Sequence, residues 1–178
     1  MSGGDIKVRR TTAMQLTNPW AAWFITALLS RRPMAFTRTA MIAATPERVF
    51  SVLSDLALAQ RWMPAIQRID GVSPGAFRLG TSWQETRKAG NRVMQSTLRV
   101  STFEPPSKLG LHVEAKALKG DLSFHLAPKS AGTEVTYEAQ MWGKGLMRLM
   151  TGTMNRMMAA EDNDILDRLR TQVEGRRT

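Results

Sequence analysis

Between Phe36 and Met141 the chain contains short runs in which apolar and polar residues alternate. The first run, FTRTAMI from Phe36 to Ile42, is rich in apolar and β-branched residues, as is typical of a strand. The later runs are separated by turn signals, which are Ser73-Pro74-Gly75, Ala89-Gly90-Asn91, Pro105-Pro106, Lys119-Gly120 and Ala131-Gly132. Short strands joined by tight turns pair antiparallel, so we predict one antiparallel sheet of about seven strands.

The predicted strands from Met94 onward each have one apolar and one polar side, because successive side chains of a strand point to opposite faces. The apolar sides hold Met94, Leu98 and Val100; Leu109, Leu111 and Val113; Leu118, Leu122, Phe124 and Leu126; and Val135, Tyr137, Ala139 and Met141. The polar sides hold Gln95, Arg99, His112, Glu114, Asp121, His125, Glu134 and Glu138. The sheet is therefore expected to have one dry face and one wet face.

The period changes to helical directly after the first strand. Thr45-Pro46-Glu47 supplies an N-cap, a proline at the first helical position and an early carboxylate, which predicts a helix that ends near Asp55. A second short helix is predicted from about Leu56 to Trp62. It ends there because the residue before Pro64 is disfavoured in helical geometry.

After Gly145 the pattern is helical again, and we predict one helix from Leu146 to about Val173. Its apolar stripe consists of Met147, Met150, Met154, Met157, Met158, Ile165, Leu169 and Val173. At the standard rise such a helix is ~40 Å long, which is enough to lie across the concave side of a sheet.

The composition excludes several kinds of chemistry. The chain has no cysteine, so it offers no disulfide, thiolate metal site or thiol nucleophile. The net charge of +10 invites a nucleic-acid partner, but the longest basic runs are pairs, which favours a soluble basic surface and no nucleic-acid binding. No metal-binding, phosphate-binding or nucleophile motif is present in the sequence, and we expect no metal and no cofactor.

One apolar segment precedes the sheet. The stretch from Trp20 to Leu29 is too short to cross a bilayer, which takes about 20 apolar residues. It is interpreted in three ways: a short helix docked on the domain, an interfacial membrane anchor, or an extension upstream of the true start codon. We therefore divide the chain into an N-terminal extension, residues 1–33, and one domain, residues 34–175.

The order of elements predicted above, and three segments within it, resemble those of a known superfamily. The segments are IAATPERVFSVLSDLALAQRWMP from Ile42 to Pro64, FEPPSKLGL from Phe103 to Leu111, and GTEVTYEAQM from Gly132 to Met141. From about Ala35 to Val173 the chain is similar to START-like (SRPBCC) proteins, which include polyketide cyclase/dehydrase and lipid-transport proteins. The resemblance implies an α+β helix-grip fold, in which a curved antiparallel sheet wraps around a long C-terminal helix and encloses a cavity.

The resemblance makes the C-terminal helix one wall of that cavity. Methionine adapts to varied apolar shapes, so the Met stripe suits a ligand-lining role, although ordinary core packing explains it as well. The residues expected to contact a ligand are Trp62, Trp83, Leu98, Leu111, Phe124, Tyr137, Met150, Met154 and Met157.

Charged residues that could carry chemistry occur in two places. Trp83, Glu85 and Arg87 share one side of a strand, so both charges enter the cavity if Trp83 does and are solvated if it does not. Glu161 and Asp162 interrupt the apolar stripe, and an inward carboxylate there would have a raised pKa, whereas a solvated charge run is the alternative. The candidate catalytic residues are Glu85, Arg87 and Glu161.

These features lead to three hypotheses. The first is a non-catalytic carrier or sensor of a hydrophobic small molecule such as a lipid, quinone or polyketide. The second is a cyclase/dehydratase that uses the same cavity. The third is a lipid shuttle docked on a membrane through Trp20 to Leu29. The chain is expected to be cytoplasmic, or peripheral at the membrane in the third case, and a monomer or weak homodimer.

Overall fold

The computed structural model of the chain describes residues 36–89, 92–116, 118–143, 145, 149 and 151–175. The apolar segment from Trp20 to Leu29, with its three interpretations, lies outside the described residues, and so do Met147 and Met150. No helix in the described part of the chain is long and apolar enough to span a membrane.

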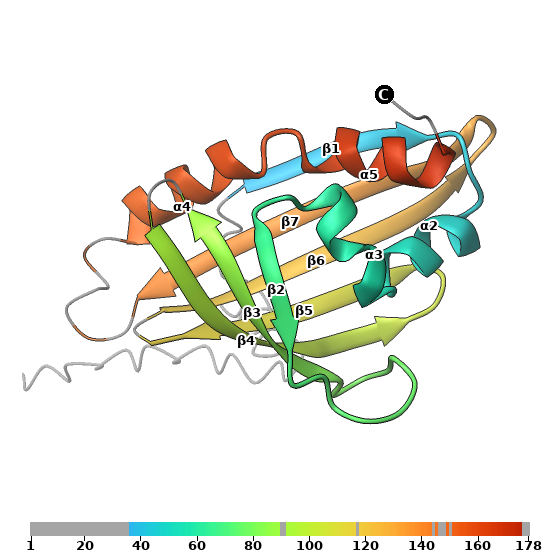
Figure 1. The fold of residues 1–178 in the computed structure, drawn as a ribbon. Coiled ribbons are helices and arrows are strands. Elements are labelled where there is room, and N and C mark those ends of the chain that lie inside the picture. The colour runs from blue at the N-terminus through green and yellow to red at the C-terminus, as the bar shows by residue number, and fades with distance from the viewer. Residues whose placement is uncertain are drawn as a thin grey trace, which may run out of the picture. The chain divides into compact units, whose positions relative to one another are not determined.

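Seven strands in these ranges form one antiparallel sheet of order β1-β7-β6-β5-β4-β3-β2 (Figure 1). The strands are β1 (Phe36–Ile42), β2 (Ile66–Asp70), β3 (Ser82–Ala89), β4 (Arg92–Glu104), β5 (Lys108–Ala115), β6 (Leu118–Lys129) and β7 (Gly132–Gly143). Consecutive strands from β2 to β7 are neighbours in the sheet, and those from β3 to β7 follow one another after only a few residues. The first strand pairs with the last, so the chain must cross from one edge of the sheet to the other between β1 and β2.

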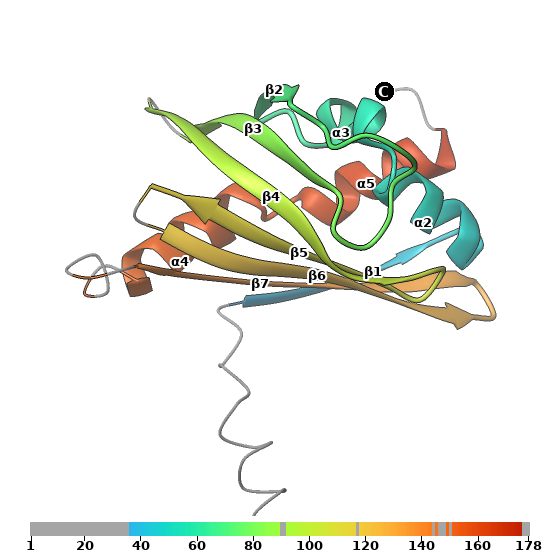
Figure 2. The same cartoon turned by 90° about the horizontal axis from the view of Figure 1, so that it is seen from below.

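Two short helices make that crossing, and two more follow the last strand. They are α2 (Pro46–Leu53), α3 (Leu56–Trp62), α4 (Thr151–Glu161) and α5 (Ile165–Glu174). Figures 1 and 2 show all four on the same side of the curved sheet. The predicted α+β helix-grip fold is confirmed.

The local signals for α2 and α3 act as expected from the sequence. The side chain of Thr45 accepts a hydrogen bond from the backbone of Arg48, and Pro46 is the first residue of α2. Asp55 caps α3 by accepting from the backbone of Ala57. These caps satisfy N–H groups that a helix start otherwise leaves without partners.

The apolar sides of β4 to β7 form the core beneath the helices. Leu98, Val100, Leu109, Val135 and Ala139 are all buried, and the polar sides face outward. Met94 departs from this pattern because it is exposed. In the described part of the chain the helices pack mainly on β1, β2, β6 and β7, and not on β4, where Met94 lies.

The C-terminal helical segment is divided in two. We predicted continuous helix to Val173, but a turn at residues 162–164 separates α4 from α5. The backbone N–H of Asp162 still bonds the carbonyl of Met158, while its side chain is buried in the domain interior, where it accepts a hydrogen bond from Tyr137. A short polar side chain that is held inside the fold favours a break in the helix at its own position.

Candidate functional site

A cavity of about 40 Å³ lies between the sheet and helices α2, α3 and α5. Its wall is mostly apolar and includes many aromatic rings. The lining residues are Leu53, Leu56, Ala59, Trp62, Met63, Ile69, Phe77, Trp83, Glu85, Arg87, Leu98, Leu109, Leu111, Leu122, Phe124, Tyr137 and Ile165.

Six of the nine residues expected to contact a ligand line this cavity: Trp62, Trp83, Leu98, Leu111, Phe124 and Tyr137. Of the three methionines expected to contact a ligand, Met157 is the one whose side chain the structure describes. Met157 is 56% exposed and does not line it, Met150 is outside the described residues, and the side chain of Met154 is not described.

The orientation of α4 explains the position of Met157. Asn155 faces β7, where its side chain amide bonds both the N–H and the carbonyl of Met141, at 2.8 and 3.0 Å. Met157 is two positions further along, about 200° around the helix, and therefore points away from the sheet. Met158 instead packs against the core.

One corner of the cavity is polar. Trp83 and Glu85 are each 3% exposed, so this side of β3 faces the interior and brings Arg87 with it. Nε of Arg87 donates to a carboxylate oxygen of Glu85 at 2.8 Å, and a terminal guanidinium nitrogen contacts the sulfur of Met63 at 3.7 Å. Of the two alternatives for Glu85 and Arg87, cavity or solvent, the structure therefore has both side chains at the cavity.

A second buried pair adjoins the first. The phenol of Tyr137 donates to Oδ2 of Asp162 at 2.7 Å, and Oδ1 of the same carboxylate lies 3.9 Å from Nη1 of Arg87. Four side chains from β3, β7 and the α4–α5 turn thus converge on one point. We refer to Glu85, Arg87, Tyr137 and Asp162 as the polar cluster.

Burial dominates the acid–base behaviour of the polar cluster. Desolvation raises the pKa of Asp162 more than the charge of Arg87 and the hydrogen bond from Tyr137 lower it. Burial, followed by the negative charge of Asp162, raises the pKa of Tyr137 well above its ordinary value. Desolvation lowers the pKa of Arg87, but the two carboxylates outweigh it and hold that pKa above its usual value. The guanidinium is therefore charged, and the protonated form of Asp162 is favoured relative to a solvated aspartate.

Glu161 is exposed, whereas its neighbour Asp162 is 7% exposed and belongs to the polar cluster. Desolvation is also the leading cause that raises the pKa of Glu161, against the opposing charge of Arg87. Of the two carboxylates that interrupt the apolar stripe, the structure brings Asp162 to the cavity side. The sequence analysis named Glu161 as the candidate, and this member of the pair is exposed and does not line the cavity.

Aromatic rings connect the polar cluster to the opposite wall. Phe124 stacks on Tyr137 with ring centroids 4.8 Å apart, and Trp62 meets Phe124 edge-on at 6.2 Å. Phe77, from the connection between β2 and β3, contacts Trp83 at 6.1 Å. Such contacts add stability beyond area burial and hold the rings in defined orientations.

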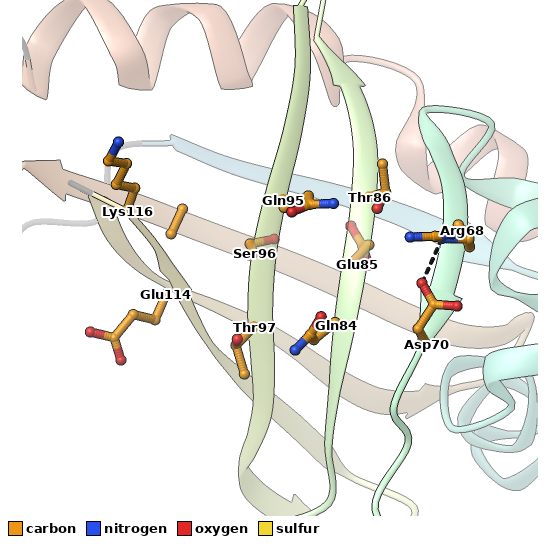
Figure 3. A pocket seen from close by; sticks show the side chains of 11 residues that line it. Arg68, Asp70, Gln84, Glu85, Thr86, Gln95, Ser96, Thr97, Glu114 and Lys116 are labelled. Atoms are coloured by element: carbon orange, nitrogen blue, oxygen red, sulfur yellow. Dashed lines mark ion pairs between the residues drawn. The ribbon is translucent and has the colours of Figure 1, made fainter.

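A larger and more open pocket of about 400 Å³ lies on strands β2 to β5 (Figure 3). Its lining is polar and comes mostly from the outer face of the sheet, where Gln84 and Thr86 alternate with the inward Trp83 and Glu85. Arg68 and Asp70 form a solvated ion pair there at 2.6 Å. Exposed ion pairs of this kind contribute little to stability.

In the described ranges, no group of three His, Asp or Glu side chains could hold a metal ion. Both histidines lie on the outer face of the sheet. His112 bonds Asp121 at 2.7 Å, and His125 lies 3.6 Å from Glu138.

Residues 33–174 match a sequence family described as polyketide cyclase / dehydrase and lipid transport. The chain belongs to this family. The suspected START-like helix-grip relationship is thereby confirmed, and membership supports hydrophobic ligand binding in general terms. No curated protein matches the chain in sequence.

Several solved structures have the same fold, and the superposition covers nearly the whole length of each of them. TTHA0849 from Thermus thermophilus superposes with a TM-score of 0.66 at 15% identity, over 80% of this chain and 98% of that one. A conserved protein from Geobacillus kaustophilus gives 0.63 at 15% identity, over 78% and 94%. Ara h 8.0201 gives 0.62 at 16% identity, over 79% and 97%. This member of the polyketide cyclase/dehydrase family shares only 15–16% identity with these three structures. The likeness therefore establishes the fold alone.

Proposed function

We propose that the protein binds a hydrophobic small molecule, such as a lipid, quinone or polyketide, in the cavity between sheet and helices, as a carrier or sensor. The observation that carries this proposal is the composition of the cavity wall, which is aliphatic and aromatic except for Glu85, Arg87 and the phenol of Tyr137 at one corner. Ligand sites typically combine an apolar lining with a few placed polar groups.

The cavity must enlarge to accept such a ligand. Its volume of about 40 Å³ holds a few water molecules at most, whereas ligand pockets span roughly 300–1,000 Å³. Phe77 is the lining residue best placed to move, because it lies in the irregular connection between β2 and β3 and is only partly buried. We expect ligand entry to displace this connection and leave the sheet in place.

Native mass spectrometry of the full chain, followed by extraction of what co-purifies, tests the proposal. The variant Ala59→Val places two methyl groups in the cavity wall, and Ala57→Val makes the same change at an exposed position of the same helix. We expect Ala59→Val to lower ligand occupancy at least tenfold and Ala57→Val to leave it unchanged. Equal occupancy in both variants, or no bound small molecule under any condition, would contradict binding at this site.

A second candidate function is cyclase/dehydratase activity, and the convergence of the polar cluster favours it. In such a reaction a carboxylate of Asp162 would take a proton from the carbon beside a substrate carbonyl, while Arg87 stabilises the enolate oxygen. The enolate carbon would then attack a second carbonyl, whose oxygen receives the proton that Asp162 took. Removal of a second proton from the same carbon and its delivery to the new hydroxyl would form the carbon–carbon double bond and release water. In this candidate Asp162 takes the role first considered for Glu161.

Incubation with a linear 1,3,5-triketone separates the two candidate functions, because dehydration removes about 18 Da from the substrate, as the loss of one water requires. An enzyme of this kind would form the cyclic product faster than a protein-free control, and Asp162→Asn would abolish the acceleration. Glu161→Gln, with its exposed carboxylate, would not. Binding without acceleration would leave the carrier or sensor as the function.

We also propose that the protein docks on a membrane through Trp20 to Leu29, a segment outside the described ranges. Liposome flotation of the full chain and of a chain that lacks residues 1–33 tests it. Binding that is lost with the truncation would support a lipid shuttle. A full chain that stays unbound would exclude one.

A further inference from the structure

Two buried donors in the cavity wall have no hydrogen-bond acceptor among the described residues. Nε1 of Trp62 and Nε1 of Trp83 are inaccessible to solvent and lack a partner, and both side chains line the cavity. Buried polar groups are nearly always hydrogen-bonded, so two unpartnered donors in one wall call for an explanation. An indole N–H only donates, and each therefore requires an acceptor atom.

We propose that these two indoles select an apolar ligand that carries a neutral carbonyl oxygen, as a ketone, ester or quinone does. This inference rests on the proposed binding function and narrows it to a ligand class. A hydrocarbon in the enlarged cavity would leave both N–H groups unpaired, whereas a carbonyl oxygen has two lone pairs to offer them. Each donor that gains an acceptor is expected to strengthen binding about tenfold.

The charges of the polar cluster argue against a carboxylate ligand. Glu85 and Asp162 already share the single guanidinium of Arg87, at 2.8 and 3.9 Å. Trp83 lies two positions from Glu85 on the same side of β3, about 7 Å away along the strand. A ligand carboxylate at Trp83 would therefore be a third negative charge in a poorly solvated space, which like-charge repulsion disfavours.

The two indoles reach the cavity from different elements. Trp62 is the last residue of α3, and Trp83 lies in β3. A ligand with two carbonyl groups, such as a quinone or a diketone, could satisfy both donors, and a ligand with one carbonyl could satisfy one. For a given carbon skeleton, the preference for the carbonyl compound over the hydrocarbon should therefore increase with the number of carbonyl groups.

Competition by native mass spectrometry tests this selection on the full chain after removal of co-purified lipid. The probes are sets with matched skeletons: tridecane, 2-tridecanone and tridecanoate for a chain, and naphthalene, 1,4-naphthoquinone and 1-naphthoate for rings. Within each skeleton that binds, we expect the ketone or quinone to exceed both the hydrocarbon and the carboxylate at least tenfold.

The variants Trp62→Phe and Trp83→Phe keep an aromatic ring and remove the N–H. We expect each to reduce the carbonyl preference, and the double variant to abolish it, while hydrocarbon binding persists as an internal measure of an intact cavity. Trp142→Phe removes an indole on the outer face of the sheet, beside His112, and should change nothing.

Five outcomes of this experiment differ in what they decide. Carbonyl preference that disappears in the double variant supports the inference. Binding without preference, a preference for the carboxylate, or a carbonyl preference that survives in the double variant overturns it and leaves the binding function standing. Failure of every skeleton to bind overturns the binding function as well.

Discussion

The phenol of Tyr137 and the carboxylate of Asp162 form a 2.7 Å hydrogen bond although 25 positions separate them in the sequence. One residue lies in β7 and the other in the turn between α4 and α5, and both are buried. This contact fastens the C-terminal helical segment to the sheet at the edge of the cavity. Its strength can be measured directly.

Tyr137→Phe removes the donor and leaves Oδ2 of Asp162 buried without its partner. We expect the free energy of unfolding to fall by about 1–2 kcal/mol, the range for a buried acceptor that loses its hydrogen bond. Chemical denaturation at pH 7 measures the change. Because the hydrogen bond lowers the pKa of Asp162, that pKa should also rise further in the variant. An unchanged midpoint of unfolding would show that the bond adds nothing in solution.

Arg87→Met removes the one positive charge of the polar cluster. Glu85 and Asp162 would remain buried without compensation, and we expect destabilisation by about 3 kcal/mol. The double variant Arg87→Met/Glu85→Gln should recover part of this loss, because the stranded charge is then absent. A double-mutant cycle measures the coupling free energy between Arg87 and Glu85. If the changes in the free energy of unfolding were strictly additive, a direct interaction between the two side chains would be refuted.

Asp162→Asn gives a pH-dependent test. The folded pKa of Asp162 lies above its unfolded value near 3.8, so the folded state holds the proton more tightly. The stability contribution of this carboxyl is therefore present below pH 3.8 and declines as pH rises through the folded pKa. Relative to wild type, the asparagine variant should gain stability over that interval and show a constant difference above it. A difference that is flat from about pH 4 to pH 8 would contradict the pKa shift.

Gly132 begins β7 at a φ of 132°, and a Cβ there would overlap the backbone carbonyl oxygen of Ile42. We expect Gly132→Ala to destabilise the domain by more than about 2 kcal/mol, since both the backbone angle and the contact are unfavourable. Gly152 in α4 is the matched control, because a Cβ there meets nothing within 4 Å. Gly152→Ala should stabilise by about 0.5 kcal/mol. Thermal melts of both variants check the pair, and a similar effect of both would be contrary to the structure.

Alternation and turn signals were sufficient to predict the sheet, because each strand from β4 to β7 has a clear apolar side. They were insufficient for β3, where one side carries Trp83, Glu85 and Arg87 and the other is polar too. Placing that strand required knowledge of its partners: the buried Leu98 of β4 pairs with Trp83 and so places it on the inner face. The cluster was missed as a unit because its members come from three distant segments.

The C-terminal segment shows a different limit. Helical periodicity treated Met157 and Met158 alike, yet only Met158 packs against the core. The difference depends on how α4 is rotated, which the side chain of Asn155 fixes through its two bonds to Met141. The break at residue 162 likewise depends on a tertiary contact with Tyr137, and periodicity contains no information on such contacts.

Asp162 and Ile165 follow all seven strands of the described sheet in the sequence, so they are synthesised after the sheet part of the cavity wall. The sheet residues of its wall precede them, and Ile165 in α5 supplies the last lining side chain. A nascent chain that ends before residue 162 lacks the carboxylate that Tyr137 bonds in the finished protein. The cavity wall can therefore be completed only after residue 165 has been synthesised, and a chain released earlier lacks part of the wall that the finished protein has.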